Sequence, residues 1–538
     1  MAEDVETAQM LGQMVDAVSY MAMSMRLSPS LHRAILFAAR NVDEPLAGRL
    51  RQVVLEVELR KFETLEDAFL DLARTYDPGN EEFQQALRSL RTAELQATSD
   101  GVERSLDRAT STVFEGTRRR VRDFADGLQR PVFVLFSLGV VLPLMVGSML
   151  PLMAAGGIGG SIWIAIGLMD VVFPVLFILT TRRILGRRPL VRPSARVKVD
   201  WSGRGPRTLA AIAVGASLVG LGLFCGHVAN DIAQADAQLD AALADGSLVD
   251  MNPAQRDALE ARVTATQGDA LVGLAVLVGP LPVLWGVAAS VAILFIPVLR
   301  EPRRRRQEVV AVEDALPDAL FQIGSRVADG MPLEPAIRRT ASSLGDEPLA
   351  ALLQRALAHI TLKRTSASEA LFGREGALTG FPSENVSASL KTIIALVRKD
   401  VTGAGRTIVA VSDHLRDLRK VDREVASRLR PVTDMMRSTA LLFAPVILGI
   451  TSALYLVVAR LAPSLPFSSA AAAPIPAGTF ALVLGIFVMS IAAATMHFTA
   501  RLSHGDDPVE GRYQAARALP VAIGVFTVAS IIGQAVIV

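Results

Sequence analysis

The sequence predicts an all-α, polytopic membrane protein with about seven transmembrane helices and two duplicated cytoplasmic helical-bundle domains. First, 51% of its 538 residues are hydrophobic and 20% are charged, and the apolar residues gather in runs of 18 or more. Second, the polar regions repeat apolar residues at three- and four-residue spacing, which is typical of amphipathic helices, and strand patterns are nearly absent. Third, one polar region recurs, in similar form, in the second half of the chain.

The apolar runs predict membrane spans, because about 20 apolar residues cross a hydrocarbon core of about 30 Å as a helix. The N-terminus, MAEDVETAQM, lacks the basic start and apolar core of a cleaved signal peptide, so insertion is expected to use internal helices. Seven spans are predicted, at about 132–153, 158–180, 208–229, 270–299, 439–459, 476–499 and 518–538.

The charged loops predict the orientation of these spans. The loop 182–207 carries nine Lys or Arg against the single acid Asp200, whereas the segment 230–269 carries eight acids against Arg256 and Arg262. Lys and Arg resist translocation, so the basic loops are expected in the cytoplasm. The N-terminus is then cytoplasmic and the C-terminus lies outside, in a multi-pass protein of the cytoplasmic membrane.

The outer segment 230–269 predicts a short acidic helical hairpin. Asn252 is a suitable N-cap for its second helix, with Pro253 at the first helical position. Its acids form either a solvated face or a cation site. They lack the glycine and ligand spacing of an EF-hand loop, which favours the solvated face.

The repeat is plainest in the pentapeptide DEPLA, which occurs at 43–47 and again at 346–350. Similar stretches flank both copies: VDAVSYMAMSMRLSPSLHRAI (15–35) with PDALFQIGSRVADGMPLEPAI (317–337), ELRKFETLEDAF (58–69) with TLKRTSASEALF (361–372), and RDFADGLQRPV (122–132) with REVASRLRPV (423–432). Each copy ends at a membrane span. The pattern indicates a duplication.

Each DEPLA is interpreted as a helix start. Pro45 and Pro348 suit the first turn of a helix, with Asp43 and Asp346 as N-caps. Pro29 and Pro332 also suit helix starts. The pentapeptide is not expected to perform chemistry.

The duplication predicts the domain organisation. Each cytoplasmic domain is followed by three spans, and the fourth span returns the chain to the cytoplasm, so the two repeats are parallel. The predicted parts are a cytoplasmic helical domain (1–131), spans one to three (132–229), the acidic outer hairpin (230–269), span four (270–299), a second cytoplasmic helical domain (300–438) and spans five to seven (439–538).

The sequence contains no recognisable catalytic apparatus. The motifs GxxxxGK[ST], HExxH and GxSxG are absent, so no phosphate cradle, zinc helix or nucleophile elbow is expected. The only cysteine, Cys225, lies in an apolar run, which excludes an intrachain disulfide. No catalytic, cofactor-binding or metal-binding residues are predicted, and the chain is not expected to be an enzyme. The six histidines have no ligand spacing: His32, His227, His359, His414, His497 and His504.

Asp170, in IGLMDVVFP, is the one carboxylate well inside a predicted span. An ionisable group in a membrane is by default a functional hypothesis, here proton or ion coupling. The alternative is structural. Asp170 lies four residues before Pro174, where a kinked helix leaves backbone groups that need partners, and it could also pair with a basic residue of another helix.

Basic clusters flank several spans. They include Arg118–Arg120 and two further groups with candidate partner-binding residues, namely Arg182, Arg183, Arg187 and Arg188, and Arg303, Arg304, Arg305 and Arg306. One interpretation is topology plus attraction to anionic membrane lipids. Another is docking of an acidic cytoplasmic partner. Nucleic acid is not an expected partner, because almost no aromatics accompany the clusters.

The second copy of the repeat also resembles a domain of a known family. The run LPDALFQIGSRVADGMPLEPAIRRTASSLGDEPLA (316–350), with LKRTSASEALF (362–372) and a long helix entering a span, resembles the type II secretion F domain. Two such domains in one chain are similar to archaeal FlaJ/TadC-like platform proteins of archaella and adhesive pili. The resemblance is strongest over 313–460 and weaker over 15–150.

The resemblance implies a platform protein of a type IV filament or type II secretion-like machine. Its implied partners are a cytoplasmic hexameric secretion ATPase and pilin or archaellin subunits, with a homodimer as one arrangement. It implies no catalytic residues or cofactors. Archaellum, adhesive pilus and secretion pseudopilus all remain open.

Two other classes are considered. A solute transporter with parallel internal repeats would use Asp170 as its coupling group, but intramembrane polar residues are few. A membrane sensor would bind a ligand at the acidic outer hairpin, but no signalling effector domain is recognisable.

Overall fold

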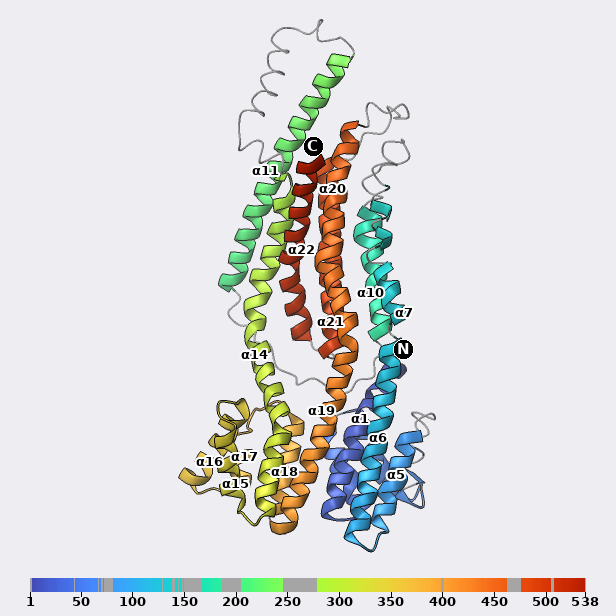
Figure 1. Ribbon diagram of the computed structural model, residues 1–538, viewed down its shortest axis with the longest axis vertical. Helices are drawn as coiled ribbons and strands as arrows, with labels where there is room; N and C mark the ends of the chain where they lie inside the picture. Colours follow the sequence, from blue (N-terminus) through green and yellow to red (C-terminus); the bar gives the residue numbers. More distant parts are fainter. Residues whose placement is uncertain are drawn as a thin grey trace. The chain divides into compact units, whose positions relative to one another are not determined.

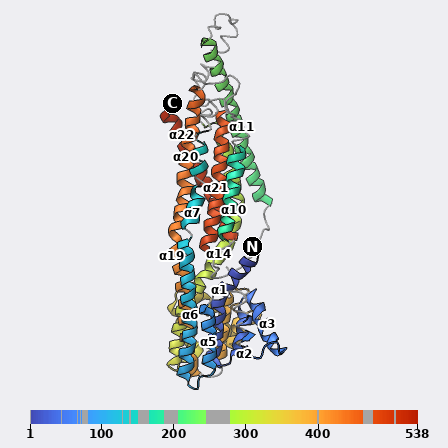
Figure 2. The same cartoon turned by 90° about the vertical axis from the view of Figure 1, so that its right-hand side faces the viewer.

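The computed structural model consists of helices joined by turns and short irregular segments over the residues it describes (Figures 1 and 2). It describes residues 2–42, 44–65, 67–68, 71, 81–127, 129–137, 141–143, 145–147, 149, 166–185, 205–244, 278–397, 401–461, 476–504 and 508–537. No strand occurs among these residues, so the predicted all-α class is confirmed for them.

The chain divides into two compact units. Unit 1 consists of Met1–Leu128, Leu185–Lys198 and Pro302–Arg430, and unit 2 consists of Gln129–Ile184, Val199–Glu301 and Pro431–Val538. The two segments predicted as cytoplasmic domains thus fall mostly in one unit. We call residues 2–127 the first lobe and residues 302–430 the second lobe of unit 1.

The first lobe is a helical bundle with an apolar core. Among its fully buried side chains are Met21, Ile35, Leu50 and Phe83. Each such side chain is worth about 1.5–3 kcal/mol in transfer free energy. The helices described in this lobe are α1 (Ala2–Leu27), α2 (Leu31–Asn41), α3 (Leu46–Glu58), α5 (Glu81–Glu94) and α6 (Ser99–Gly127).

Two helix starts in the first lobe are held by side chains from neighbouring helices. The backbone N–H of Leu46 donates to Oε1 of Gln13 at 3.1 Å, and that of Leu31 donates to Oε1 of Glu94 at 3.0 Å. The first amides of a helix have no partner within it, so these bonds satisfy otherwise unpaired donors. They also fix how α1, α2, α3 and α5 meet.

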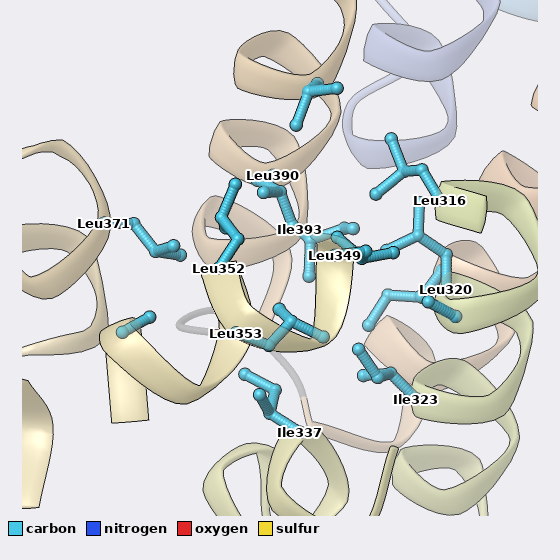
Figure 3. Packing of buried hydrophobic residues seen from close by; sticks show 14 of the residues in the cluster. Leu316, Leu320, Ile323, Ile337, Leu349, Leu352, Leu353, Leu371, Leu390 and Ile393 are labelled. Atoms are coloured by element: carbon cyan, nitrogen blue, oxygen red, sulfur yellow. The ribbon is translucent and has the colours of Figure 1, made fainter. Parts of the chain in front are cut away.

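The second lobe packs around α16. Leu349 and Leu353 of this helix point into a cluster lined by α14 and α18, including Leu320 and Ile393 (Figure 3). The helices of this lobe are the 302–328 part of α14 (Leu281–Ala328), α15 (Leu333–Ser343), α16 (Pro348–Lys363), α17 (Ala367–Phe372), α18 (Glu384–Val397) and the 401–430 part of α19 (Val401–Ser438).

Glycines let α14 and α19 approach closely in the second lobe. A Cβ at Gly405 would lie 2.2 Å from the backbone nitrogen of Ala328, and one at Gly324 would lie 2.8 Å from that of Val409. Neither backbone contact can move without shifting a helix, so only glycine fits at both positions.

Two helices of the first lobe recur in the second at one spacing. The starts of α2 and α3 precede those of α15 and α16 by 302 residues each. Buried positions recur as well. Leu46 and Leu50 of α3 are buried like Leu349 and Leu353 of α16, 303 residues later.

The DEPLA segments begin helices, but not with the predicted caps. In the second copy Glu347, not Asp346, is the N-cap residue, and Pro348 is at the first helical position as expected. Glu347 adopts the extended conformation typical of an N-cap (φ −65°, ψ 146°), which moves the helix start one residue closer to the proline. In the first copy Pro45 is the residue before the helix, and Asp43 lies outside the described residues.

Unit 2 contains long apolar helices. Five described helices are long and apolar enough to cross a membrane: Gly205–Ile232, Leu281–Ala328, Ala426–Val457, Ala477–Ser503 and Val509–Val536. They agree with the third to seventh predicted spans and indicate a multi-pass membrane protein. The first and second predicted spans lie partly outside the described residues, as do 270–277 of the fourth span and 245–269 of the outer hairpin with Asn252 and Pro253.

The helices assigned to unit 2 are α7 (Gln129–Phe136), η2 (Gly167–Val172), α10 (Phe173–Leu185), α11 (Gly205–Ala244), the 281–301 part of α14, the 431–438 part of α19, η4 (Thr439–Phe443), α20 (Ala444–Leu461), α21 (Ala477–His504) and α22 (Pro508–Ile537). Helices α20, α21 and α22 pack side by side (Figures 1 and 2). The rings of Tyr455 and Phe480 stack between α20 and α21 with centroids 4.2 Å apart.

Small residues bring α11 against α14. A Cβ at Gly222 would lie 2.6 Å from the backbone nitrogen of Val283, and the hydroxyl of Ser290 donates to the carbonyl of Ala211 at 2.9 Å. Small residues at a helix interface let two backbones approach closely, as they do here.

Candidate functional site

Asp170 lies in the π-helix η2, three residues before Phe173 begins α10. Proline has no N–H and its ring displaces the carbonyl four residues earlier, which for Pro174 is the carbonyl of Asp170 itself. A π-turn accommodates this change, and such turns are frequent at functional sites. The side chain of Asp170 also lacks a partner, because its Oδ1 is buried and has no hydrogen bond in the described structure.

Apolar contacts flank Asp170. Met169 of η2 is fully buried, and the rings of Phe173 in α10 and Phe487 in α21 meet edge to face with centroids 6.4 Å apart. Among the described residues no basic side chain forms an ion pair with Asp170, so the predicted pairing is not observed there.

A second π-helix, η4, opens the fifth predicted span. It covers Thr439–Phe443, and Ser137 and Val141 of the first predicted span are also π-helical, 302 residues earlier. The spacing equals that of the helix starts in the lobes. π-helical residues therefore occur near the start of both the first and the fifth predicted span.

The predicted basic clusters differ in exposure. Arg182 and Arg183 are exposed in the last turn of α10, where cations interact favourably with the helix dipole. Arg187 and Arg188 lie outside the described residues.

On α14, Arg304 and Arg305 are exposed, whereas Arg303 and Arg306 are half-buried. The guanidinium of Arg304 contacts the carboxylate of Glu308 at 3.2 Å, one turn away. Both groups are more than half exposed, so the pair contributes little to stability.

The cluster preceding the first span is engaged within unit 1. Arg119 pairs with Glu82 of the same lobe at 3.3 Å. Arg118 and Arg122 both pair with Glu424 of the second lobe, at 3.1 and 3.2 Å. These arginines therefore help to join the lobes.

The pair between Arg122 and Glu424 has a further property. These residues are 302 residues apart in sequence, and they lie in the two stretches, 122–132 and 423–432, that resemble each other. The lobes also share apolar contacts, since Met23 is part of the second lobe's core and Phe37 packs against it.

The most enclosed ion pairs of the second lobe were not predicted. Arg419 of α19 pairs with Glu313 at 2.8 Å and with Asp314 at 3.0 Å, and Ser383 donates to the other oxygen of Glu313 at 2.6 Å. Arg419 and Glu313 are 15% and 18% exposed. Each of these enclosed charged groups has a partner, which is typical of a structural network.

Unit 2 contains a comparable chain of side-chain hydrogen bonds. Nη2 of Arg437 donates to Gln514 at 3.0 Å, and Gln514 donates to the buried Glu510 at 2.8 Å. These bonds were not predicted, because the sequence shows only that charged residues lie near span ends, and membrane topology alone would explain that. No group of His, Cys, Asp and Glu suited to a metal ion occurs among the described residues.

Comparison of the chain with protein-family models, with curated proteins and with solved structures finds no match. Function therefore has to be argued from the repeat, the spans and the contacts described above.

Proposed function

We propose that the chain is a platform protein of a type IV filament or type II secretion-like machine in the cytoplasmic membrane. It would couple a cytoplasmic hexameric secretion ATPase to the insertion of pilin or archaellin subunits into a growing filament. The proposal extends the resemblance over 316–350 and 362–372 to the whole chain.

The observation that carries the proposal is the recurrence of helix starts across the two lobes, from α2 to α15 and from α3 to α16, each at 302 residues. It supports a duplicated helical domain, as the resemblance implies. Seven spans with the N-terminus in the cytoplasm and the C-terminus outside follow from this arrangement.

The mechanism assigned to this chain is mechanical. Two similar lobes would receive force from the ATPase, and the apolar helices would pass it to pilin helices in the bilayer. The chain itself would supply no catalysis, cofactor or nucleic-acid binding. Enclosed ion pairs such as Arg419 with Glu313 suit a lobe that transmits force without unfolding.

Deletion of the gene tests the proposal. We expect pilin subunits to accumulate in the membrane and surface filaments to disappear, with solute uptake unchanged. Replacement of Arg182, Arg183, Arg187, Arg188 and Arg303–Arg306 by Glu tests whether the basic clusters contact the ATPase. Normal filaments in the deletion strain would refute the platform function.

A second candidate is a solute transporter with parallel internal repeats. The observation in its favour is the buried, unpartnered Oδ1 of Asp170 in a π-helix. Asp170→Asn separates the two candidates: a transporter would lose coupled uptake, whereas a platform protein would keep both filaments and uptake.

A further inference from the structure

Asp170 is the one acidic residue inside any of the seven predicted spans, and none of these spans contains Lys or Arg. In the second predicted span, 158–180, 12 residues precede Asp170 and 10 follow it. At about 1.5 Å per residue, Asp170 is about 15–18 Å along the helix from either end, near the middle of a hydrocarbon core about 30 Å thick. Its carboxyl group is therefore isolated at mid-depth from any basic residue of the spans.

Asp170 lies at the border between the packed side and the open side of its helix. Met169 and Phe173 are buried where η2 and α10 pack on α21. On the open side, Val171 and Val175 are 54% and 50% exposed. Asp170 itself is half-buried, and its Oδ1 has no hydrogen bond among the described residues. A group that approaches from the open side can reach the carboxyl group without displacing α21.

The chain offers no cation for this carboxyl group at its own depth. The histidines of the spans, His227 and His497, each lie two residues from the end of a predicted span. A second copy of the chain has the same spans and cannot supply Lys or Arg either. A metal ion needs several ligands, and the described residues contain no group of three His, Cys, Asp or Glu that could hold one. Lipid headgroups lie at the membrane surface, about 15 Å away.

We infer that Asp170 is a docking site for a membrane helix of a different protein, one that carries a lysine or arginine at mid-depth. Ionisable residues inside membranes pair with one another, and a carboxylate accepts charge-assisted hydrogen bonds from an ammonium or guanidinium group. Pairing neutralises two charges that lipid would otherwise surround. The two helices are therefore expected to prefer each other to lipid.

The apolar residues of the open side would complete the contact but do not select the partner. Lipid tails are as apolar as leucine, so Val171, Val175 and Leu179 can be covered by lipid or by a helix alike. The carboxyl group supplies the selection, because only a partner with a cation at the matching depth satisfies it. This inference goes beyond the platform function and does not depend on it.

The test uses the purified full chain in phosphatidylcholine vesicles, with synthetic single-span peptides as the probes. The peptides are leucine–alanine helices of about 21 residues, with Lys, Gln or Leu at the centre and a photoreactive diazirine beside it. The Lys peptide is expected to crosslink to the chain at an about tenfold lower concentration than the Leu peptide, the effect of one polar contact between membrane helices. The Gln peptide, which has hydrogen-bond donors but no charge, should need a higher concentration than the Lys peptide.

Variants of the chain assign the preference to one side chain. Asp170→Asn removes the charge with little change of shape and should abolish the preference for the Lys peptide. Asp170→Lys should reverse it, so that a peptide with a central Asp crosslinks best. Val175→Asn is the matched control, because it places an amide on the open side of the same helix and should leave the preference unchanged. Protease protection in the vesicles checks that each variant is inserted, and the wild type and Asp170→Asn decide the matter if Asp170→Lys is not.

Three results would overturn the inference. Equal crosslinking of the Lys and Leu peptides to the wild type would mean that the carboxyl group is satisfied within the chain or by a proton. A preference that persists in Asp170→Asn would place the cation elsewhere. A Gln peptide that binds as tightly as the Lys peptide would assign the contact to hydrogen bonding without charge. The readout is crosslinking, so each result is distinct from the filament and uptake phenotypes that test the platform function.

Discussion

The two lobes of unit 1 share a helix order but not their polar bonds. In the first lobe, Gln13 and Glu94 hold helix starts, and Arg26 pairs with Asp107 at 2.5 Å. In the second lobe, Arg419 joins α19 to two acids of α14. The shared part is the spacing of helices and of buried apolar residues. The two lobes are therefore alike in their apolar periodicity and differ in the side chains that join their helices.

The largest predicted effect tests the shared part. Leu50→Ala and Leu353→Ala truncate matching core residues that are 0% and 2% exposed. Each should lower the free energy of unfolding by about 2–5 kcal/mol through lost burial and a residual cavity. Denaturant unfolding of the purified full chain, followed by pulse proteolysis, measures both.

Leu55→Ala is the matched control, because Leu55 lies on the same helix as Leu50 but is 52% exposed. It should change the free energy of unfolding by less than about 0.5 kcal/mol. Losses at Leu50 and Leu353 that differ severalfold would mean that the lobes do not share an equivalent core.

The next effect tests the divergent part. Arg419→Met leaves Glu313 and Asp314 without their partner, and should cost about 2–3 kcal/mol, less than the 3–5 kcal/mol of a fully buried pair. Arg26→Met should cost about 1 kcal/mol, because Asp107 is 60% exposed and remains hydrated. The same unfolding assay compares them, and equal losses would contradict the distinction drawn here.

The sequence was sufficient for the features that depend on local pattern. The apolar runs located the five described membrane-length helices, and the DEPLA repeat located α3 and α16. It was insufficient for bonds between distant residues, such as Glu313 with Arg419, which are 106 residues apart. Charge patterning within one helix says nothing about which charges another helix will bring opposite. The predicted N-cap was wrong by one residue in the second DEPLA segment, where Glu347 precedes the helix, and by two in the first, where Pro45 does. Residue type alone does not fix where the backbone turns helical.

A smaller effect tests how the lobes meet. Arg122→Glu places a second carboxylate beside Glu424, and Glu424→Arg places a third guanidinium beside Arg118 and Arg122. Each single change should lower stability by about 1 kcal/mol, because the groups are partly exposed. The double exchange should recover part of that loss if the contact at equivalent turns is real, and a double-mutant cycle in the unfolding assay measures the coupling. Strictly additive effects would argue against it.

The smallest effect compares how acid changes the stability contributed by two ion pairs, one at the end of α3 and one at the end of α16. A hydrogen bond from Lys363 lowers the pKa of Glu375, and hydrogen bonds from Lys61 and then Gln52 lower the pKa of Glu56, both below the ordinary value of 4.5. A carboxylate whose pKa is lower in the folded protein stabilises the fold above its unfolded pKa, and that contribution is lost as the pH falls through the folded pKa. Lys363→Met and Lys61→Met should therefore be less stable than the wild type at neutral pH, and the difference should shrink below pH 4.5.

Denaturation midpoints measured from neutral pH into that range give the comparison, with Lys391→Met as an exposed control. Each pair contains a side chain that is at least half exposed, so solvent screens both pairs and the differences will be small. A pH-dependent difference at only one of the two helix ends would show that the two ends differ in their electrostatics.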